Sequence, residues 1–373
     1  MNKAVVGFVA GAVVVGAAGY GTMVYPQQRA KQQIDLVIAT LPSNMHVSYQ
    51  TLQYSLFSGK LSLGGFEMSV TENDETMTAK LATITARDFK KGHVGELRGN
   101  GLTIEDAAKT MRIEAEELAG EGLEGDEGVL RGMGSAAPLV VKRLAMTGIT
   151  LNMGEDKAKL REVVLADYRQ TDKVPLSMTL GVHGMLIEPQ SLPDADAREG
   201  LAKLGYDKLS LNFDLSYAHN PETKRLSIKQ ASIGGDNIGQ LSVSMDLGGI
   251  ETAGIEDPMI AMAAAQMATL ERAELRYDDA SLTNRILKLA ATETGMDEAQ
   301  FKSSLLTQLA QEAPEDALAK QVMDSATAFL TNPKSLSLNL KPAHPLPLVQ
   351  LMGGAQDPYA LANTMGMTVS ANR

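Results

Sequence analysis

Apolar and polar residues alternate through much of the first two thirds of the chain. The alternation begins at Val47 and Tyr49 and continues with short interruptions. A period of two is typical of strands that bury one face. A turn is expected at Ser58-Gly59, and the paired Gly64-Gly65 predicts a β-bulge. The first part of the chain is therefore predicted to be β-rich.

A short glycine-containing pattern returns along this region. The segment Leu97–Leu102 (LRGNGL) is echoed by Leu118–Leu123 (LAGEGL), with looser relatives at Met146–Ile149 and Val182–Met185. Glycine at these points permits positive φ or a bulge. The recurrence predicts a long meander of short antiparallel strands.

The clearest strand signal lies in the middle of the chain. Apolar side chains alternate with polar ones over residues 209–217, return through 226–228 and resume at 241–247. Turns over residues 219–222 and 234–235 separate the three segments. This pattern predicts a three-stranded meander with one apolar and one polar face.

Helical periodicity precedes and follows the strands. We expect a short helix from Gln27 to Leu41 and a helical linker over residues 191–204. Pro258–Leu270 is apolar around nearly its whole circumference, which predicts a buried helix.

Three further helices are expected near the C-terminus. Ser281 is predicted to cap a helix that ends before Gly295. Asp297 and Gln300 form a capping box for the next, and Pro314 opens the third. Leu336, Leu338 and Leu340 then restore the alternation of a strand.

These patterns predict an α+β fold. A long antiparallel β-meander forms a curved, groove-like sheet, one N-terminal transmembrane helix precedes it, and a helical C-terminal subdomain follows. The expected divisions are an N-terminal transmembrane anchor or signal-anchor at 1–28, a first β-rich region at 29–190, a helical linker and β-meander at 191–256, and a helical C-terminal subdomain with terminal strands at 257–373.

The N-terminus has the character of a membrane segment. Residues 4–28 carry no charged side chain, and Ala4–Val24 reaches the roughly 20 apolar residues that cross a bilayer. A cleaved signal peptide, with small residues at Val15–Ala18, is the alternative. Both interpretations predict export of the remainder. The expected membrane anchor residues are Val5, Val9, Val13, Val14, Val15 and Tyr25.

Composition narrows the classes of partner. The chain has a formal net charge of −11, only 4% aromatic residues and no Trp. An acidic chain repels phosphate backbones and lacks stacking platforms, so nucleic acid is excluded as a partner. The absence of Cys excludes disulfides, thiolate metal sites and cysteine nucleophiles.

Catalytic patterns are missing from the sequence. The five histidines are isolated, and neither HxH nor HExxH occurs. Gly122, Gly125 and Gly128 lack the strand-to-helix context and the Lys-Ser/Thr of a phosphate loop. No GxSxG motif is present. We therefore predict no enzymatic activity, no catalytic residues, no metal ligands and no cofactor.

Several segments suggest relatives. Phe57–Met68 (FSGKLSLGGFEM), Leu209–Ile233 and Ala273–Ala291 resemble bacterial envelope proteins with YdgA-type domains of unknown function and the AsmA-like group. The resemblance implies a single N-terminal membrane helix and a long β-sheet with an apolar concave face. It also implies a place in the bacterial inner membrane, with the main domain in the periplasm, and a part in phospholipid movement or envelope maintenance.

Two functions remain open from the sequence. One is a membrane-anchored periplasmic protein that binds lipid or another apolar ligand in a β-groove. The other is a structural or adaptor component of an envelope assembly, as a homo-oligomer or with a protein partner. The candidate ligand-binding residues, for which plain core packing is the alternative, are Phe213, Leu215, Met245, Leu247, Met259, Met262 and Met267.

Overall fold

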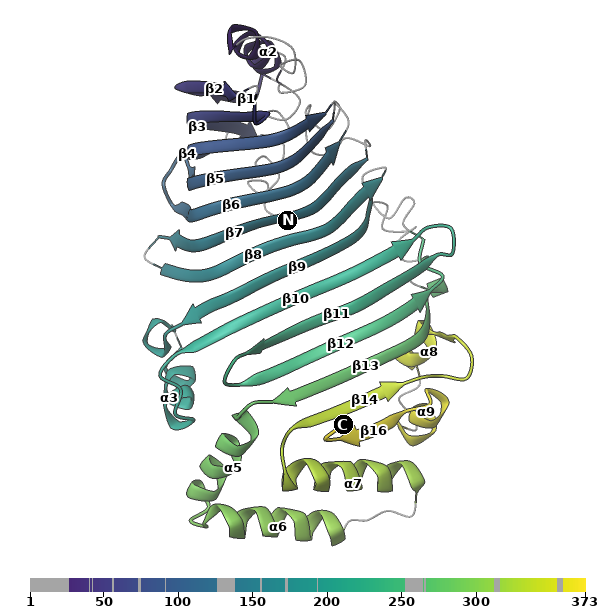
Figure 1. Ribbon diagram of the computed structural model, residues 1–373. Helices are drawn as coiled ribbons and strands as arrows, with labels where there is room; N and C mark the ends of the chain where they lie inside the picture. Colours follow the sequence, from purple (N-terminus) through teal and green to yellow (C-terminus); the bar gives the residue numbers. More distant parts are fainter. Residues whose placement is uncertain are drawn as a thin grey trace. The chain divides into compact units, whose positions relative to one another are not determined.

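The computed structural model describes most of the chain beyond residue 26 (Figure 1). Within 27–373 the described residues exclude 40, 42, 56, 73–74, 91, 126–137, 155, 172–173, 193, 252–263, 265, 312–315 and 354–357. The chain divides into two compact units, Met1–Met185 and Leu186–Arg373, each of which is described by itself.

The expected membrane anchor falls almost wholly in residues 1–26, outside the described residues. Among the helices that the structure does describe, none combines the length and the apolar character needed to cross a membrane.

Unit 1 is an open antiparallel sheet. Strands β3 to β9 are neighbours in sequence order, while the short strands β1 and β2 both pair with β3. The strands are β1 (Met45–Ser48), β2 (Thr51–Ser55), β3 (Lys60–Glu72), β4 (Glu75–Lys90), β5 (His93–Asp106), β6 (Met111–Gly125), β7 (Leu139–Met153), β8 (Asp156–Thr171) and β9 (Val174–Ile187). The predicted meander is confirmed, with strands far longer than expected.

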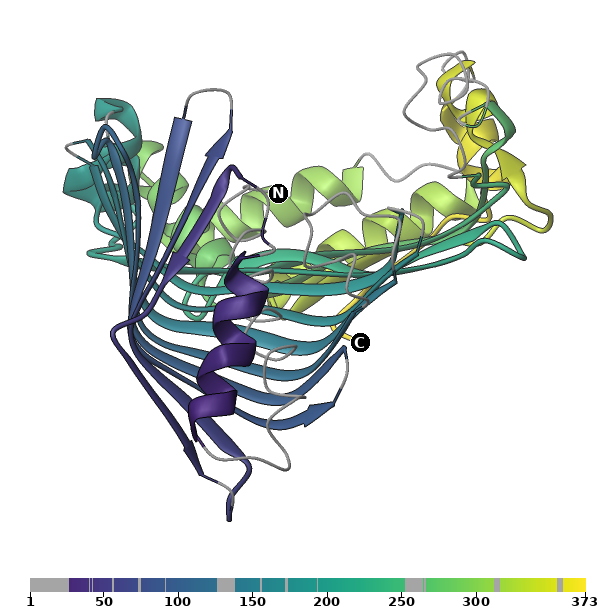
Figure 2. The same ribbon diagram turned by 90° about the horizontal axis from the view of Figure 1, so that it is seen from above.

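One helix packs against this sheet. Helix α2 (Gln27–Ala39) follows the predicted periodicity and ends before Pro42. Its Ile34 is buried in the same apolar cluster as the sheet residues, and Ile38 and Leu41 pack against that cluster. Figure 2 shows α2 on the inner side of the bent strands.

The strands of unit 1 bend part-way along their length (Figure 2). Glycines with positive φ lie at the bend in alternate strands, and residues without this conformation lie opposite them. The first line contains Gly65, Gly101, Gly148 and Gly184, with Ala82, Glu116 and Arg161 on the strands between them. Of the glycines in the recurring sequence pattern, Gly101, Gly148 and Gly184 therefore lie on this first line with positive φ.

A second line of positive φ crosses the neighbouring strands. It holds Asp88 on β4, Gly122 on β6 and Asp167 on β8. Gly95 and Lys142 lie between them at the registers of β5 and β7. The two lines use alternate strands, β3, β5, β7 and β9 for the first and β4, β6 and β8 for the second.

The bend changes the phase of the hydrophobic pattern. Buried positions that are two residues apart within a strand become three apart at the bend, as at Leu63 and Phe66 or Leu81 and Ile84. The two residues between them face outward, so the apolar face continues on both sides of the bend. The β3–β4 register is the same before and after Gly65. The predicted bulge is thus wrong: Gly64-Gly65 forms a kink with no inserted residue.

The core of unit 1 lies on the inner face of this bent sheet. Leu61, Leu97, Leu102 and Leu118 have almost no exposed surface. Burial weakens toward β8 and β9, where Val163, Met178 and Val182 are only partly buried.

In unit 2 the strands are also antiparallel, and helices flank them. Its strands are β10 (Leu209–Asn220), β11 (Arg225–Gly235), β12 (Gly239–Gly248), β13 (Thr269–Asp279), β14 (Ser335–Leu340), β15 (Leu346–Pro347) and β16 (Thr368–Ala371). They lie in the order β10-β11-β12-β13-β14-β16, with β15 beside β13. The predicted three-stranded meander is confirmed as β10 to β12.

Along the chain of unit 2, helices precede the three-stranded meander and follow β13. They are η3 (Pro189–Ser191), α3 (Ala195–Lys203), α5 (Leu282–Glu293), α6 (Glu298–Gln311), α7 (Ala317–Thr331), α8 (Leu348–Gly353) and α9 (Pro358–Thr364). Each unit is therefore mainly β with a few helices, in agreement with the coarser part of the predicted fold.

Local capping follows the sequence in part. Asp297 and Gln300 form the predicted box, since each backbone N–H donates to the other's side chain. Ser281 occupies the N-cap position of α5 as predicted, but its side chain does not cap the helix. Its hydroxyl donates to the Asn237 carbonyl, and Asp279 accepts from the Thr283 backbone N–H instead. Helix α7 begins at Ala317 with Asp316 as its cap.

The expected apolar helix over 258–270 is wrong at its end. Thr269 and Leu270 belong to β13, where they pair with β12 and β15. Met267 is 73% exposed, so its side chain is not buried as predicted. Residues 258–263 lie outside the described residues.

Candidate functional site

The apolar face of the unit 2 sheet is the strongest candidate for a binding surface. Direct cross-strand pairs place Phe213 beside Ile233, Ile233 beside Leu241 and Leu241 beside Tyr277. Leu275 pairs with Val243 in the neighbouring row. Because paired residues share one face, these side chains form a continuous row across four strands.

Four large side chains of this face are open to solvent. Phe213 is 38% exposed, Ile233 54%, Leu241 43% and Leu275 41%. Large apolar side chains gathered on a soluble surface cost free energy unless something covers them, so such a surface is a candidate for ligand or partner binding. We call Phe213, Ile233, Leu241 and Leu275 the open apolar patch.

The same face is closed where helix α7 packs. Phe329 of α7 meets Tyr277 edge to face, with ring centroids 6.0 Å apart. Phe329 is buried, and the Ser325 hydroxyl donates to the Val369 carbonyl of β16. The helix therefore covers the face around Tyr277 and toward β16, and it leaves the open apolar patch uncovered.

The predicted ligand-binding residues divide into three groups. Phe213 and Leu215 lie on β10, and Met245 and Leu247 lie on β12, on the same apolar face as the open apolar patch. Of these four, only Phe213 is exposed, and the other three are partly buried. Met267 lies at the edge just before β13, and Met259 and Met262 lie outside the described residues.

Three residues of the open apolar patch were missed by the sequence reasoning. Ile233, Leu241 and Leu275 follow the same alternation as the chosen residues, so the pattern identified their face. Their exposure depends on which parts of the face α7 covers. That packing leaves no signal in the alternation.

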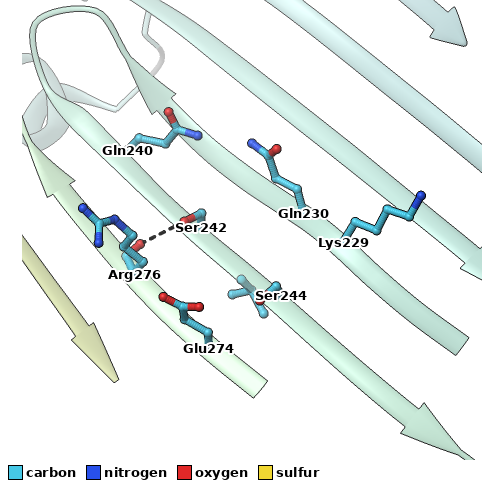
Figure 3. A pocket seen from close by; sticks show the side chains of 8 residues that line it. Lys229, Gln230, Gln240, Ser242, Ser244, Glu274 and Arg276 are labelled. Carbon is cyan, nitrogen blue, oxygen red and sulfur yellow. Dashed lines mark hydrogen bonds between the residues drawn. The ribbon is translucent and has the colours of Figure 1, made fainter. Parts of the chain in front are cut away.

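The opposite face of the same strands is polar and slightly hollowed. A depression of about 240 Å³ lies across β11, β12 and β13 (Figure 3). The polar side chains that line it, labelled in Figure 3, are Lys229, Gln230, Gln240, Ser242, Ser244, Glu274 and Arg276. A bulge in β11 supplies two consecutive side chains to this face, since the register shifts between Ile228 and Ala231.

The Arg276 side chain of this depression is held by its neighbours. Arg276 donates to both carboxylate oxygens of Asp278, which raises the pKa of the guanidinium. It also donates to the Ser337 hydroxyl and the Arg373 carbonyl. These bonds anchor the end of the chain, so Arg276 has a structural role.

A denser polar cluster joins α5 to the neighbouring turns. The Arg285 guanidinium lies 4.3 Å from the centre of the Tyr206 ring and donates to the carbonyls of Leu204 and Gly205. Ser281 donates to the Asn237 carbonyl and lies 3.1 Å from the Tyr206 hydroxyl. Because these donors are engaged with backbone carbonyls, the cluster fixes the start of α5.

Two tyrosines that donate a hydrogen bond to a carboxylate have raised pKa values. Burial and a hydrogen bond donated to Asp279 raise the pKa of Tyr277 to about 12. Burial and a bond donated to Asp35 raise the pKa of Tyr49. Each phenol is a hydrogen-bond donor to a carboxylate and stays protonated near neutral pH.

Groups of three or more His, Asp or Glu able to hold a metal ion are absent from the part of the chain that the structure describes.

Comparisons with known proteins bear on unit 2. A family model described as an uncharacterized protein matches residues 232–372, which run from β11 to β16. The description names no activity, and the match does not link the chain to the AsmA-like or YdgA-type groups. The comparison with curated proteins gives no match.

Proposed function

We propose that the chain is a membrane-anchored envelope protein that binds lipid or another apolar ligand on the unit 2 sheet. The binding surface is the open apolar patch together with the partly buried side chains beside it, used as a groove. The anchor is the charge-free N-terminal segment of the sequence, and both units lie on the periplasmic side of a bacterial inner membrane.

The observation that carries the proposal is the exposure of one row of side chains. Phe213, Ile233 and Leu241 are direct neighbours on adjacent strands and all remain open to water. Three inter-strand spacings separate β10 from β13, about 14 Å in all. An acyl chain laid across the row would remove apolar surface of both the lipid and the protein from water. Each CH₂ group buried in this way contributes about 0.8 kcal/mol to binding.

The chemistry of the face favours apolar ligands as a class. Its rows hold Leu, Ile, Val, Met, Phe and Tyr side chains, and the Tyr277 hydroxyl donates to Asp279. Directional hydrogen bonds, which select individual polar ligands, are therefore few on this face. We propose binding without catalysis, and we propose no cofactor.

The adaptor alternative depends on an exposed sheet edge or another protein contact. The outer strands are short: β1 has four residues, β2 has five and β16 has four. Short edge strands disfavour the addition of a strand from a partner. The open apolar patch therefore supports ligand binding more directly than assembly through strand edges.

Lipid retained by the purified chain tests the proposal. The full-length protein is purified gently from membranes and examined for bound lipid by native mass spectrometry. Leu241→Glu places a charge on the apolar face and is expected to remove the lipid adduct. Gln240→Glu adds the same charge at the adjacent position of β12, on the polar face, and is expected to retain it.

Two outcomes contradict the proposal. One is a bare protein mass for the wild type under conditions that preserve other lipid complexes. The other is equal loss of lipid in Leu241→Glu and Gln240→Glu, because the face of the strand would then be irrelevant.

A further inference from the structure

A fully exposed aromatic side chain marks one end of unit 1. Phe57 lies in the turn between β2 and β3 and has an exposed fraction of 107%, the highest among the large apolar side chains described. The turn passes through Gly59 at φ 57° and is closed by the Ser55–Lys60 pair. The ring therefore projects from the end of this hairpin.

Basic side chains gather on the strands beside this turn. Lys60, Arg87 and Arg98, with Thr85 and a single acid, Glu96, line a depression of about 300 Å³ on β3, β4 and β5. The cross-strand pairs Thr85–Arg98 and Arg87–Glu96 hold these residues in adjacent rows. Arg98 also meets Glu117 at 3.5 Å and remains 67% exposed.

The charge of this cluster is opposite in sign to the net charge of the chain. The whole sequence has a formal net charge of −11, whereas the depression is lined by three cations and one anion. An anionic surface repels the chain as a whole, so attraction has to be local. Phosphate groups accept charge-assisted hydrogen bonds from Arg and Lys in such a cluster.

The path of the chain brings a bilayer close to this end. The charge-free stretch of the sequence ends at Gln28, and its apolar part ends at Val24. Gln27, at the start of α2, donates from its side chain to the Leu52 carbonyl of β2 at 3.0 Å. Three residues span at most about 11 Å, and the five from Leu52 to Phe57 at most about 18 Å.

We propose that this end of unit 1 rests on a phospholipid bilayer that carries anionic headgroups. Phe57 enters the interface between headgroups and acyl chains, and Lys60, Arg87 and Arg98 contact lipid phosphates. The inference rests on the anchor in the proposed function and is independent of ligand binding by unit 2. It gives unit 1 a fixed orientation at the membrane surface.

The absence of Trp in the chain allows a direct test. Phe57→Trp introduces a single indole, and the full-length protein is reconstituted into nanodiscs of phosphatidylcholine alone or mixed with phosphatidylglycerol. In the mixed discs the emission is expected to shift to shorter wavelength and to be quenched by brominated lipid. The control is Met153→Trp at the β7–β8 turn, which lies at the opposite ends of the strands and is expected to stay solvent-like.

Charge reversal tests the basic cluster. Lys60→Glu with Arg87→Glu, in the Phe57→Trp protein, is expected to abolish the difference between the two kinds of disc. Lys109→Glu with Arg112→Glu, near the β5–β6 turn at the other end of the sheet, makes the same change in charge and is expected to leave that difference intact.

Three results would overturn the inference. If the Phe57→Trp protein is held in the disc while its indole emission stays solvent-like, the proposed contact of Phe57 with the bilayer is contradicted and the proposed anchor is not. Failure of the chain to enter the disc contradicts both the proposed anchor and the proposed contact. An equal shift in discs with and without phosphatidylglycerol removes the proposed role of the basic side chains.

Discussion

Gly122 and Lys142 lie opposite each other on β6 and β7, and a Cβ atom added at Gly122 would stand 2.9 Å from the Cβ of Lys142. Gly122 also has φ 56°, a conformation that strains other residues. It therefore combines a backbone constraint with a steric one on the second line of the bend.

Gly122→Ala is expected to destabilise unit 1 by more than about 2 kcal/mol, because left-handed strain and overpacking add. Gly154→Ala is the matched control, since Gly154 has φ 62° and nothing within 4 Å of an added Cβ. Its cost is expected to be about 1 kcal/mol. Urea unfolding followed by circular dichroism measures both, and equal losses would contradict the steric part of the account.

The apolar face of the unit 1 sheet is buried, whereas that of unit 2 is partly exposed. Leu118 has no exposed surface, whereas Leu241 is 43% exposed. Leu118→Ala is expected to cost about 2–5 kcal/mol in unfolding free energy. Leu241→Ala is expected to cost less than about 1 kcal/mol, because little buried contact is lost. A large loss in Leu241→Ala would show that something covers the open apolar patch.

The Asp316 side chain accepts from the backbone N–H groups of Leu318 and Ala319 at the start of α7. Asp316→Ala is expected to lower stability by about 1 kcal/mol. Asp324→Ala removes an exposed carboxylate from the middle of the same helix and is expected to change stability by less than about 0.5 kcal/mol. Thermal unfolding of the two variants compares them, and similar shifts would argue against the cap.

Alkaline pH is expected to weaken unit 2 through Tyr277. Its pKa is raised to about 12, chiefly by burial, while an unfolded tyrosine ionises near 10. The native state therefore retains a proton that the unfolded state loses between these values, and stability falls as pH rises through that window. Tyr277→Phe is expected to reduce this loss. Urea midpoints from pH 9 upward test it, and an unchanged slope in the variant would contradict the assignment.

Much of the fold follows from the alternation of side chains. The strands β10 and β12 carry period two along their length, and β11 departs from it only at its bulge, so their pairing and their apolar face could be predicted. Unit 1 was harder to predict because each bend shifts the phase, as between Leu81 and Ile84. A pattern broken in this way resembles several short strands, although the strands reach 16 residues.

The apolar face of unit 2 could be predicted, but not its open part. Phe213 and Leu241 obey the same rule as the buried Leu209, and all three have the same apolar character. The contact between Phe329 and Tyr277 decides where the face is covered, and it joins residues 52 positions apart. Hydrophobic periodicity identifies a face and does not report which helix covers it.

Photo-crosslinking in membranes tests ligand binding on the open apolar patch most directly. A photoreactive amino acid replaces Ile233 in the full-length chain, with Gln240 as the matched position on the polar face. We expect a phospholipid adduct at Ile233 and none at Gln240. Equal labelling at both positions, or no lipid adduct at Ile233 in protein that remains folded, would contradict the proposed function.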